Sequence, residues 1–185
     1  MLKKILIISI LFSNLLSAKI YSDLKYTLLN YSKNGTAKDF ETNGYKLTVG
    51  YMFEDLSYLE KFPYIDIGVE NSIMFAKGKK INSVGYKDET TLKDASVDID
   101  LLYSMHLKAT APIVDILYGN IYLGWDTAKI GTTASNYNDT NRWDSSISYG
   151  IGIEYWIPLG VSLQLDYMSY FNNLDGIEFG FGLKF

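Results

Sequence analysis

The sequence of 185 residues contains no cysteine, a single histidine and only three prolines. The missing cysteines exclude a disulfide scaffold, a cysteine-ligated zinc or iron–sulfur site and a thiol nucleophile. With His106 as the only histidine, a histidine-rich metal site is not expected. The formal net charge of −4 argues against a nucleic-acid partner, which requires a basic face. We therefore expect no metal, no other cofactor and no nucleic acid.

Tyrosine is the residue type that is unusually frequent, with 16 copies beside 15 glycines. Tyrosine favours β-strands, and its ring with one polar end suits boundaries between apolar and wet surroundings. Because prolines interrupt strand ladders, their low number fits the same class. The composition predicts an all-β protein.

The N-terminal segment has the features of a secretory signal peptide. Two lysines begin it, residues 5–16 are uncharged and mostly apolar, and Ala18 is a small residue that suits signal peptidase. A transmembrane helix needs about 20 apolar residues, and charge returns too soon for that. A buried N-terminal helix is the alternative. We predict a signal peptide over residues 1–18 and a barrel domain over residues 19–185.

Beyond the predicted signal peptide, apolar and polar residues alternate with a period of two, as in strands with two different faces. The clearest case has Ala95, Val97, Ile99, Leu101, Tyr103, Met105 and Leu107 on one face and Ser96, Asp98, Asp100, Leu102, Ser104, His106 and Lys108 on the other. The predicted strands lie near residues 20–31, 45–53, 65–75, 95–108, 115–127, 146–157, 161–171 and 176–185. Near 115–127 the pattern is weaker, and we favour Ile121, Leu123 and Trp125 as its apolar face.

The connections between these strands differ in length in a regular order. Long polar stretches near 32–43, 76–93 and 128–143 alternate with shorter ones near 54–62, 108–114 and 157–160. Transmembrane barrels have long loops outside and short turns on the periplasmic side. The sequence therefore predicts an eight-stranded antiparallel up-and-down transmembrane β-barrel.

A soluble barrel would alternate as well, but with its apolar face turned inward. The polar face here is rich in Gly, Ser and Thr, which fit a narrow lumen, whereas a water-exposed face would carry more Lys and Glu. Several aromatic residues also lie near strand ends on the apolar side, where the two membrane interfaces would fall. The membrane barrel is therefore favoured, and the soluble barrel remains the alternative.

The C-terminal strand ends in an aromatic residue with apolar residues alternating behind it. These residues are Ile177, Phe179, Phe181, Leu183 and Phe185. The pattern resembles that of the small eight-stranded OmpA/OmpX-like outer-membrane β-barrel proteins of Gram-negative bacteria, over nearly all of the predicted mature chain. The resemblance implies a place in the bacterial outer membrane, among its lipid and lipopolysaccharide. It also implies that the assembly machinery of this membrane reads these five residues.

The sequence departs from OmpA itself at the C-terminus. OmpA continues into a periplasmic domain that binds peptidoglycan, whereas this sequence stops at Phe185. We therefore do not expect cell-wall anchoring.

The polar face predicts an acidic lumen network. Its predicted members are Asp66, Glu70, Asp98, Asp100, Glu154, Asp166 and Glu178, with Lys46 among fewer bases. Folding 65–75 against 95–107 as a hairpin would place Glu70 roughly across from Asp100. We interpret the network as one that satisfies the lumen, and a path for cations is the alternative.

An enzymatic function has weak support in the sequence. Ser104 and His106 would share the inner face, with Asp66 across the hairpin, which would offer a nucleophile, a base and an acid. Residues i and i+2 of a strand are usually too far apart for a direct hydroxyl–imidazole bond. Neither the His-x-Ser order of lipid A deacylases nor the N-terminal amphipathic helix of palmitoyltransferase barrels is apparent. We predict that the protein is not an enzyme.

The predicted function is a structural or surface-interaction role through extracellular loops, in adhesion or envelope integrity. A narrow cation-selective conduit, or a barrel that binds a small ligand, is the alternative. Lys77, Lys79 and Lys80 make the second long connection locally basic, and they are candidate contacts for lipopolysaccharide, a surface glycan or a negatively charged host partner. The simpler interpretation is a solvated loop whose lysines keep it soluble.

Overall fold

The computed structural model describes residues 19–32, 36, 38–53, 64–86, 91–171 and 173–185. The predicted signal peptide and the predicted connection near 54–62 lie outside these residues. The described strands are β1 (Lys19–Tyr31), β2 (Phe40–Phe53), β3 (Asp66–Gly78), β4 (Ile81–Gly85), β5 (Thr91–Val114), β6 (Leu117–Ala134), β7 (Tyr137–Ile157), β8 (Val161–Phe171) and β9 (Leu174–Lys184). Among the described residues, no helix is long and apolar enough to cross a membrane.

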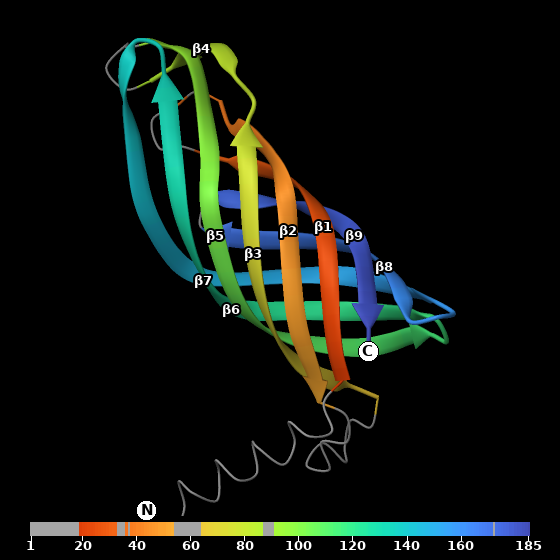
Figure 1. Ribbon diagram of the computed structural model, residues 1–185. Helices are drawn as coiled ribbons and strands as arrows, with labels where there is room; N and C mark the ends of the chain where they lie inside the picture. Colours follow the sequence, from red (N-terminus) through yellow and green to blue (C-terminus); the bar gives the residue numbers. More distant parts are fainter. Residues whose placement is uncertain (1–18, 33–35, 37, 54–63, 87–90, 172) are drawn as a thin grey trace, which may run out of the picture.

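Eight of these strands form a closed antiparallel ring (Figure 1). Within the ring, each strand pairs with the next ring strand along the chain, so β3 pairs with β5. The pairing of β1 with β9 closes the ring. Closure leaves no open edge along the body of the barrel, which is how up-and-down barrels avoid pairing with other chains. The predicted eight-stranded barrel is confirmed, and the short β4 is an addition that pairs with β5 alone.

The apolar face of the strands points outward. On β1, Leu24 and Leu28 are exposed, whereas Lys25 and Thr27 are buried. The other strands of the ring have the same orientation, apart from one part of β5, because successive side chains of a strand point to opposite faces of the sheet. A soluble barrel would show the opposite orientation, so the structure contradicts that alternative.

The orientation of β6 follows the apolar set favoured from the sequence. Ile121, Leu123 and Trp125 are exposed on the outside, whereas Asn120 and Asp126 are buried inside. This part of the prediction is confirmed.

On β5 the predicted alternation is wrong over residues 95–100. The pairing of β5 with β6 shifts register between Ile99 and Leu101, so an extra residue reverses the faces beyond that point. Val97 and Ile99 are buried, and Asp98 and Asp100 lie on the outside. The period-two pattern of the sequence does not show the position of such an extra residue, so the change of face on β5 could not be predicted from it.

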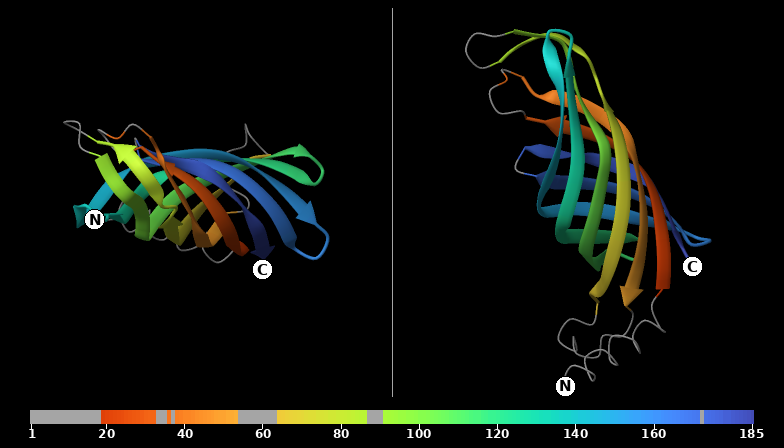
Figure 2. Two further views of the ribbon diagram at one scale, coloured as in Figure 1. Left: turned by 90° about the horizontal axis from the view of Figure 1, so that it is seen from above. Right: turned by 60° about the vertical axis from the view of Figure 1, so that its left-hand side comes forward.

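Two predicted loops are largely strand. The stretch near 128–143 is a β-hairpin in which β6 and β7 are joined through Ser135 and Asn136, and the stretch near 76–93 contains β4 and the start of β5. We call β4, residues 91–98 of β5 and the hairpin over residues 129–145 the extension. It rises beyond the rest of the ring, at the end opposite Lys19 and Phe185 (Figures 1 and 2).

Candidate functional site

The half of the lumen nearer Lys19 and Phe185 contains buried charged side chains, which we call the charged layer. It consists of Asp23, Lys25, Lys46, Glu70, His106, Lys108, Asp126, Glu154, Asp166 and Glu178. Each lysine pairs with a carboxylate across the lumen: Lys25 with Asp166 at 2.7 Å, Lys46 with Glu178 at 3.1 Å and Lys108 with Glu154 at 3.1 Å. Buried charges require such partners, since an unpaired buried ion is very costly.

Tyrosine hydroxyls also contact carboxylates of the charged layer. Tyr21 donates a hydrogen bond of 3.0 Å to Glu70, Tyr122 donates one of 3.0 Å to Asp166, and Tyr170 donates one to Glu178. The Lys108 ammonium lies 4.9 Å from the centre of the Tyr21 ring. The tyrosine hydroxyls therefore donate hydrogen bonds to the carboxylates, and the faces of the rings contact lysine ammonium groups.

Glycines make room for the larger side chains of this layer. A Cβ on Gly50 would overlap the Tyr21 ring, and one on Gly152 would overlap the Asp166 carboxylate. This close approach explains why a narrow lumen accommodates tyrosines and charged side chains together.

The predicted lumen residues fall into three groups. The structure places Lys46, Glu70, Glu154, Asp166 and Glu178 inside the charged layer. Asp66 is half-buried and lines the opening at the end that carries Lys19 and Phe185. Asp98 and Asp100 were expected inside, but they face outward, where they pair with Lys77 at 2.9 Å and Lys129 at 3.1 Å.

Glu70 faces His106 and not Asp100. Glu70 and His106 are directly opposed in the β3–β5 ladder. The His106 Nδ1 atom lies 3.4 Å from Glu70, and Nε2 lies 3.3 Å from Asp126 and 2.9 Å from the Ser148 hydroxyl. The predicted proximity of Glu70 to Asp100 is therefore wrong, because the β3–β5 register differs from the one expected for the hairpin and places Asp100 across from the Met74–Ala76 part of β3.

The Ser148, His106 and Glu70 side chains have the order of a nucleophile, a base and an orienting acid. Ser104, which the sequence suggested as the nucleophile, makes no hydrogen bond through its hydroxyl within the described structure. The three side chains of the new arrangement are at most 1% exposed. Because a substrate must reach a nucleophile before it can react, this burial argues for a structural role of the three groups.

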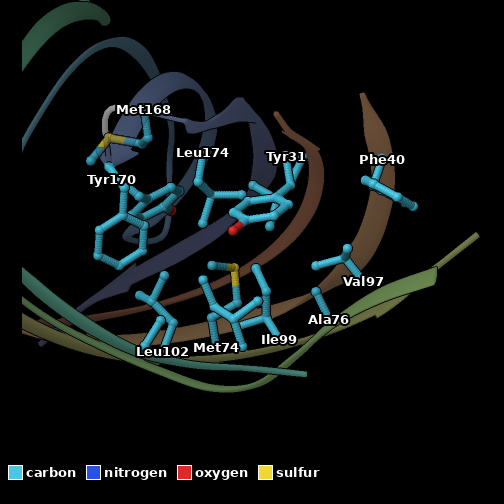
Figure 3. Packing of buried hydrophobic residues seen from close by; sticks show 14 of the residues in the cluster. Tyr31, Phe40, Met74, Ala76, Val97, Ile99, Leu102, Met168, Tyr170 and Leu174 are labelled. Carbon is cyan, nitrogen blue, oxygen red and sulfur yellow. The ribbon is translucent and has the colours of Figure 1, made fainter. Parts of the chain in front are cut away.

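The outer half of the lumen is apolar, and we call it the apolar layer. It is built from Leu29, Tyr31, Phe40, Met74, Ala76, Ile99, Leu102, Ile130, Met168, Tyr170 and Leu174, each with at most 3% of its surface exposed (Figure 3). Met74 comes two inward positions after Glu70 on β3, and Leu102 lies opposite Met74 on β5. The apolar layer therefore lies directly beyond the charged layer, on the side of the extension.

By the period-two alternation, Met74, Leu102, Met168 and Tyr170 belong to the polar, inward faces of their strands, but the sequence does not show that they form one cluster. The signal was their apolar character on otherwise polar faces, all toward the same end of their strands. Only the register between strands shows that they meet across the lumen.

The three candidate lysines do not act as one group in the structure. Lys77 pairs with Asp98, and Lys79 pairs with Glu41 at 3.3 Å. Lys79 and Lys80 line a groove at the end of the barrel that carries the extension. Lys77 is not among the lining residues of this groove.

The residues of the C-terminal pattern face outward, four of them on β9 and Phe185 directly after it. Ile177, Phe179, Phe181, Leu183 and Phe185 have exposed side chains. They form an apolar stripe along the last strand, which is paired with β1 and β8.

A closed antiparallel barrel with an apolar exterior and a charged, tightly packed interior defines a bacterial outer-membrane β-barrel protein. The chain belongs to the outer membrane protein beta-barrel domain family, whose model matches residues 14–185. No curated protein sequence matches the chain significantly. The protein is located in the bacterial outer membrane. The extension reaches beyond one end of the ring, and the β5–β6 and β7–β8 turns lie at the other end, where such barrels have their short periplasmic turns.

Solved structures share this fold at low sequence identity. Ail from Yersinia pestis, in complex with the heparin analogue sucrose octasulfate, is 16% identical, with a TM-score of 0.57 over 91% of this chain and 99% of its own. Neisserial surface protein A is 13% identical, with a TM-score of 0.51 over 89% and 95%. The N-terminal barrel domain of OprF from Pseudomonas aeruginosa is 14% identical, with a TM-score of 0.50 over 91% and 99%.

Proposed function

We propose that this protein is a non-catalytic surface-interaction barrel, which acts in adhesion or envelope integrity through its extension and outer connections. The observation that carries the proposal is the apolar layer. Met74 and Leu102 are fully buried where they face each other in the lumen. Packed apolar side chains offer a hydrated ion no ligands, so a role at the outer surface is favoured over passage through the lumen.

The extension supports the same proposal. Its hairpin carries side chains that are exposed on both faces over residues 138–143, including Trp143. Strand residues that cover no core are free to contact a partner. Ail, which shares the fold, binds a heparin analogue, and this supports a surface glycan or a host molecule as the partner here.

Shortening the β6–β7 hairpin is expected to abolish most binding to host cells or extracellular matrix and to leave the barrel intact. Ile130 and Arg142 are directly paired, so residues 131–141 can be replaced by Asn-Gly, which forms a two-residue turn between opposed residues. Binding of intact cells to immobilised matrix measures the effect. The control is Leu159→Ser, which changes an exposed residue in the periplasmic β7–β8 turn. Binding of the shortened variant at the level of the control would contradict the proposal.

We further propose that the apolar stripe of β9 is the signal that the outer-membrane assembly machinery recognises. Deleting Phe185 is expected to lower the amount of inserted barrel while export and signal cleavage continue. Heat-modifiable gel mobility of outer-membrane fractions measures insertion. Phe185→Tyr keeps an aromatic end and should insert normally. Wild-type insertion of the deletion variant would exclude Phe185 as part of the signal.

A further inference from the structure

The groove at the outer end brings together two segments that are distant in the sequence. Lys38 comes from the β1–β2 connection, and Lys79 and Lys80 come from the β3–β4 connection. Asn82 and Ser83 on β4 line the same groove, and both are exposed. The site therefore combines three ammonium groups with an amide and a hydroxyl.

The charges of this groove are not balanced internally. Its two carboxylates are Asp39, which accepts a hydrogen bond of 2.6 Å from Ser32, and Glu41, which pairs with Lys79 at 3.3 Å. Lys38 and Lys80 form no ion pair within the part of the chain that the structure describes. Two ammonium groups are thus available to an anion from outside.

The lining also indicates what kind of anion fits. Ile81 is the one apolar side chain among its lining residues in the described chain, and no aromatic residue lines it. Protein partners are usually anchored by buried aromatic or aliphatic side chains, which this surface does not accommodate. A saccharide instead presents many hydroxyl groups, for which Asn82 and Ser83 supply donors and acceptors.

We infer that this groove binds an anionic saccharide, one that carries sulfate, phosphate or carboxylate groups. Lys38 and Lys80 contact the anionic groups, Asn82 and Ser83 bind hydroxyls, and the pair of Lys79 and Glu41 holds the two segments together. The inference deepens the proposed surface-interaction role and rests on it. It also revises the candidate set, because Lys77 lies outside the groove and Lys38 belongs to it.

The test compares two double variants that lose the same charge. Lys38→Gln with Lys80→Gln removes the unpaired ammonium groups of the groove. Lys77→Gln with Lys129→Gln removes two lysines that pair with Asp98 and Asp100 outside it. Each protein is placed in phosphatidylcholine nanodiscs, and labelled dextran sulfate and polygalacturonate are titrated at about 0.15 M salt, where exposed charges more than about 8 Å apart are largely screened.

The groove variant is expected to bind dextran sulfate at least about tenfold more weakly, as the loss of two charge-assisted contacts implies, whereas the control variant should change by less than about twofold. Neutral dextran should not bind. If both variants bind dextran sulfate equally more weakly, the loss is due to the overall surface charge and not to the groove, and the inference is overturned. No binding of either polyanion by the wild-type protein in nanodiscs would also overturn it.

Competition distinguishes the source of the saccharide. Displacement by purified lipopolysaccharide assigns the site to the phosphates and acidic sugars of the surrounding outer leaflet, and displacement by soluble polyanions alone assigns it to an external glycan. Either result supports an anionic-saccharide site. If the groove variant loses nothing but hairpin-dependent cell binding persists, the groove inference fails and the surface-interaction role stands. If hairpin-dependent binding is also absent, both fail.

Discussion

Replacing Lys25 with methionine is expected to lower the free energy of unfolding of the barrel by about 3–5 kcal/mol, the usual cost of removing one partner of a buried ion pair. The Lys25 side chain is 1% exposed, and its ammonium lies 2.7 Å from Asp166 and 4.0 Å from Asp23. Methionine has a similar volume, so the change removes the charge and leaves the packing nearly intact. The cost then reflects two carboxylates left in a lumen that already contains more acids than bases.

Urea titration of the refolded barrel in lipid vesicles, followed by tryptophan fluorescence, measures this cost. Adding Asp166→Asn to Lys25→Met should restore at least half of the loss, because the second change removes a carboxylate left without its cation. Lys77→Met breaks an exposed ion pair and should leave stability unchanged. A Lys25→Met protein as stable as the wild type would show that the charged layer does not hold the strands together.

Period-two alternation predicted the strands of the ring. The outward direction of the apolar face needed a second observation, the Gly, Ser and Thr on the polar face, because a soluble barrel alternates as well. The alternation failed at the register shift between Ile99 and Leu101, where one extra residue reverses the faces of β5. It also could not predict that residues 128–143 continue as a hairpin, since polar residues exposed on both faces look like a loop.

The sequence predicts which residues belong to the charged layer more readily than it predicts which of them pair with each other. Asp166 and Glu178 follow from alternation alone, because only the face must be known. Which lysine pairs with each of them cannot be predicted in this way, since Lys25 lies 141 residues before Asp166 and the stagger of the strands around the ring decides which side chains meet. The apolar layer was missed for the same reason, because Met74 and Met168 come from distant strands.

The apolar layer is also expected to close the barrel to ions. An ion that entered the charged layer from the periplasmic side would next meet Met74, Leu102 and Tyr170, which are fully buried. An apolar constriction of this kind excludes water and raises a barrier to any charge. Met74→Ser combined with Leu102→Ser replaces two facing side chains by small polar ones and should lower that barrier, giving conductance where the wild-type protein has none.

Single-channel recording in planar bilayers separates a closed surface-interaction barrel from a conduit. We expect purified wild-type protein to produce no steady current at physiological salt concentration, and the Met74→Ser, Leu102→Ser variant to produce one. A steady, cation-selective current through the wild-type barrel would instead show that the acidic lumen is a path for cations.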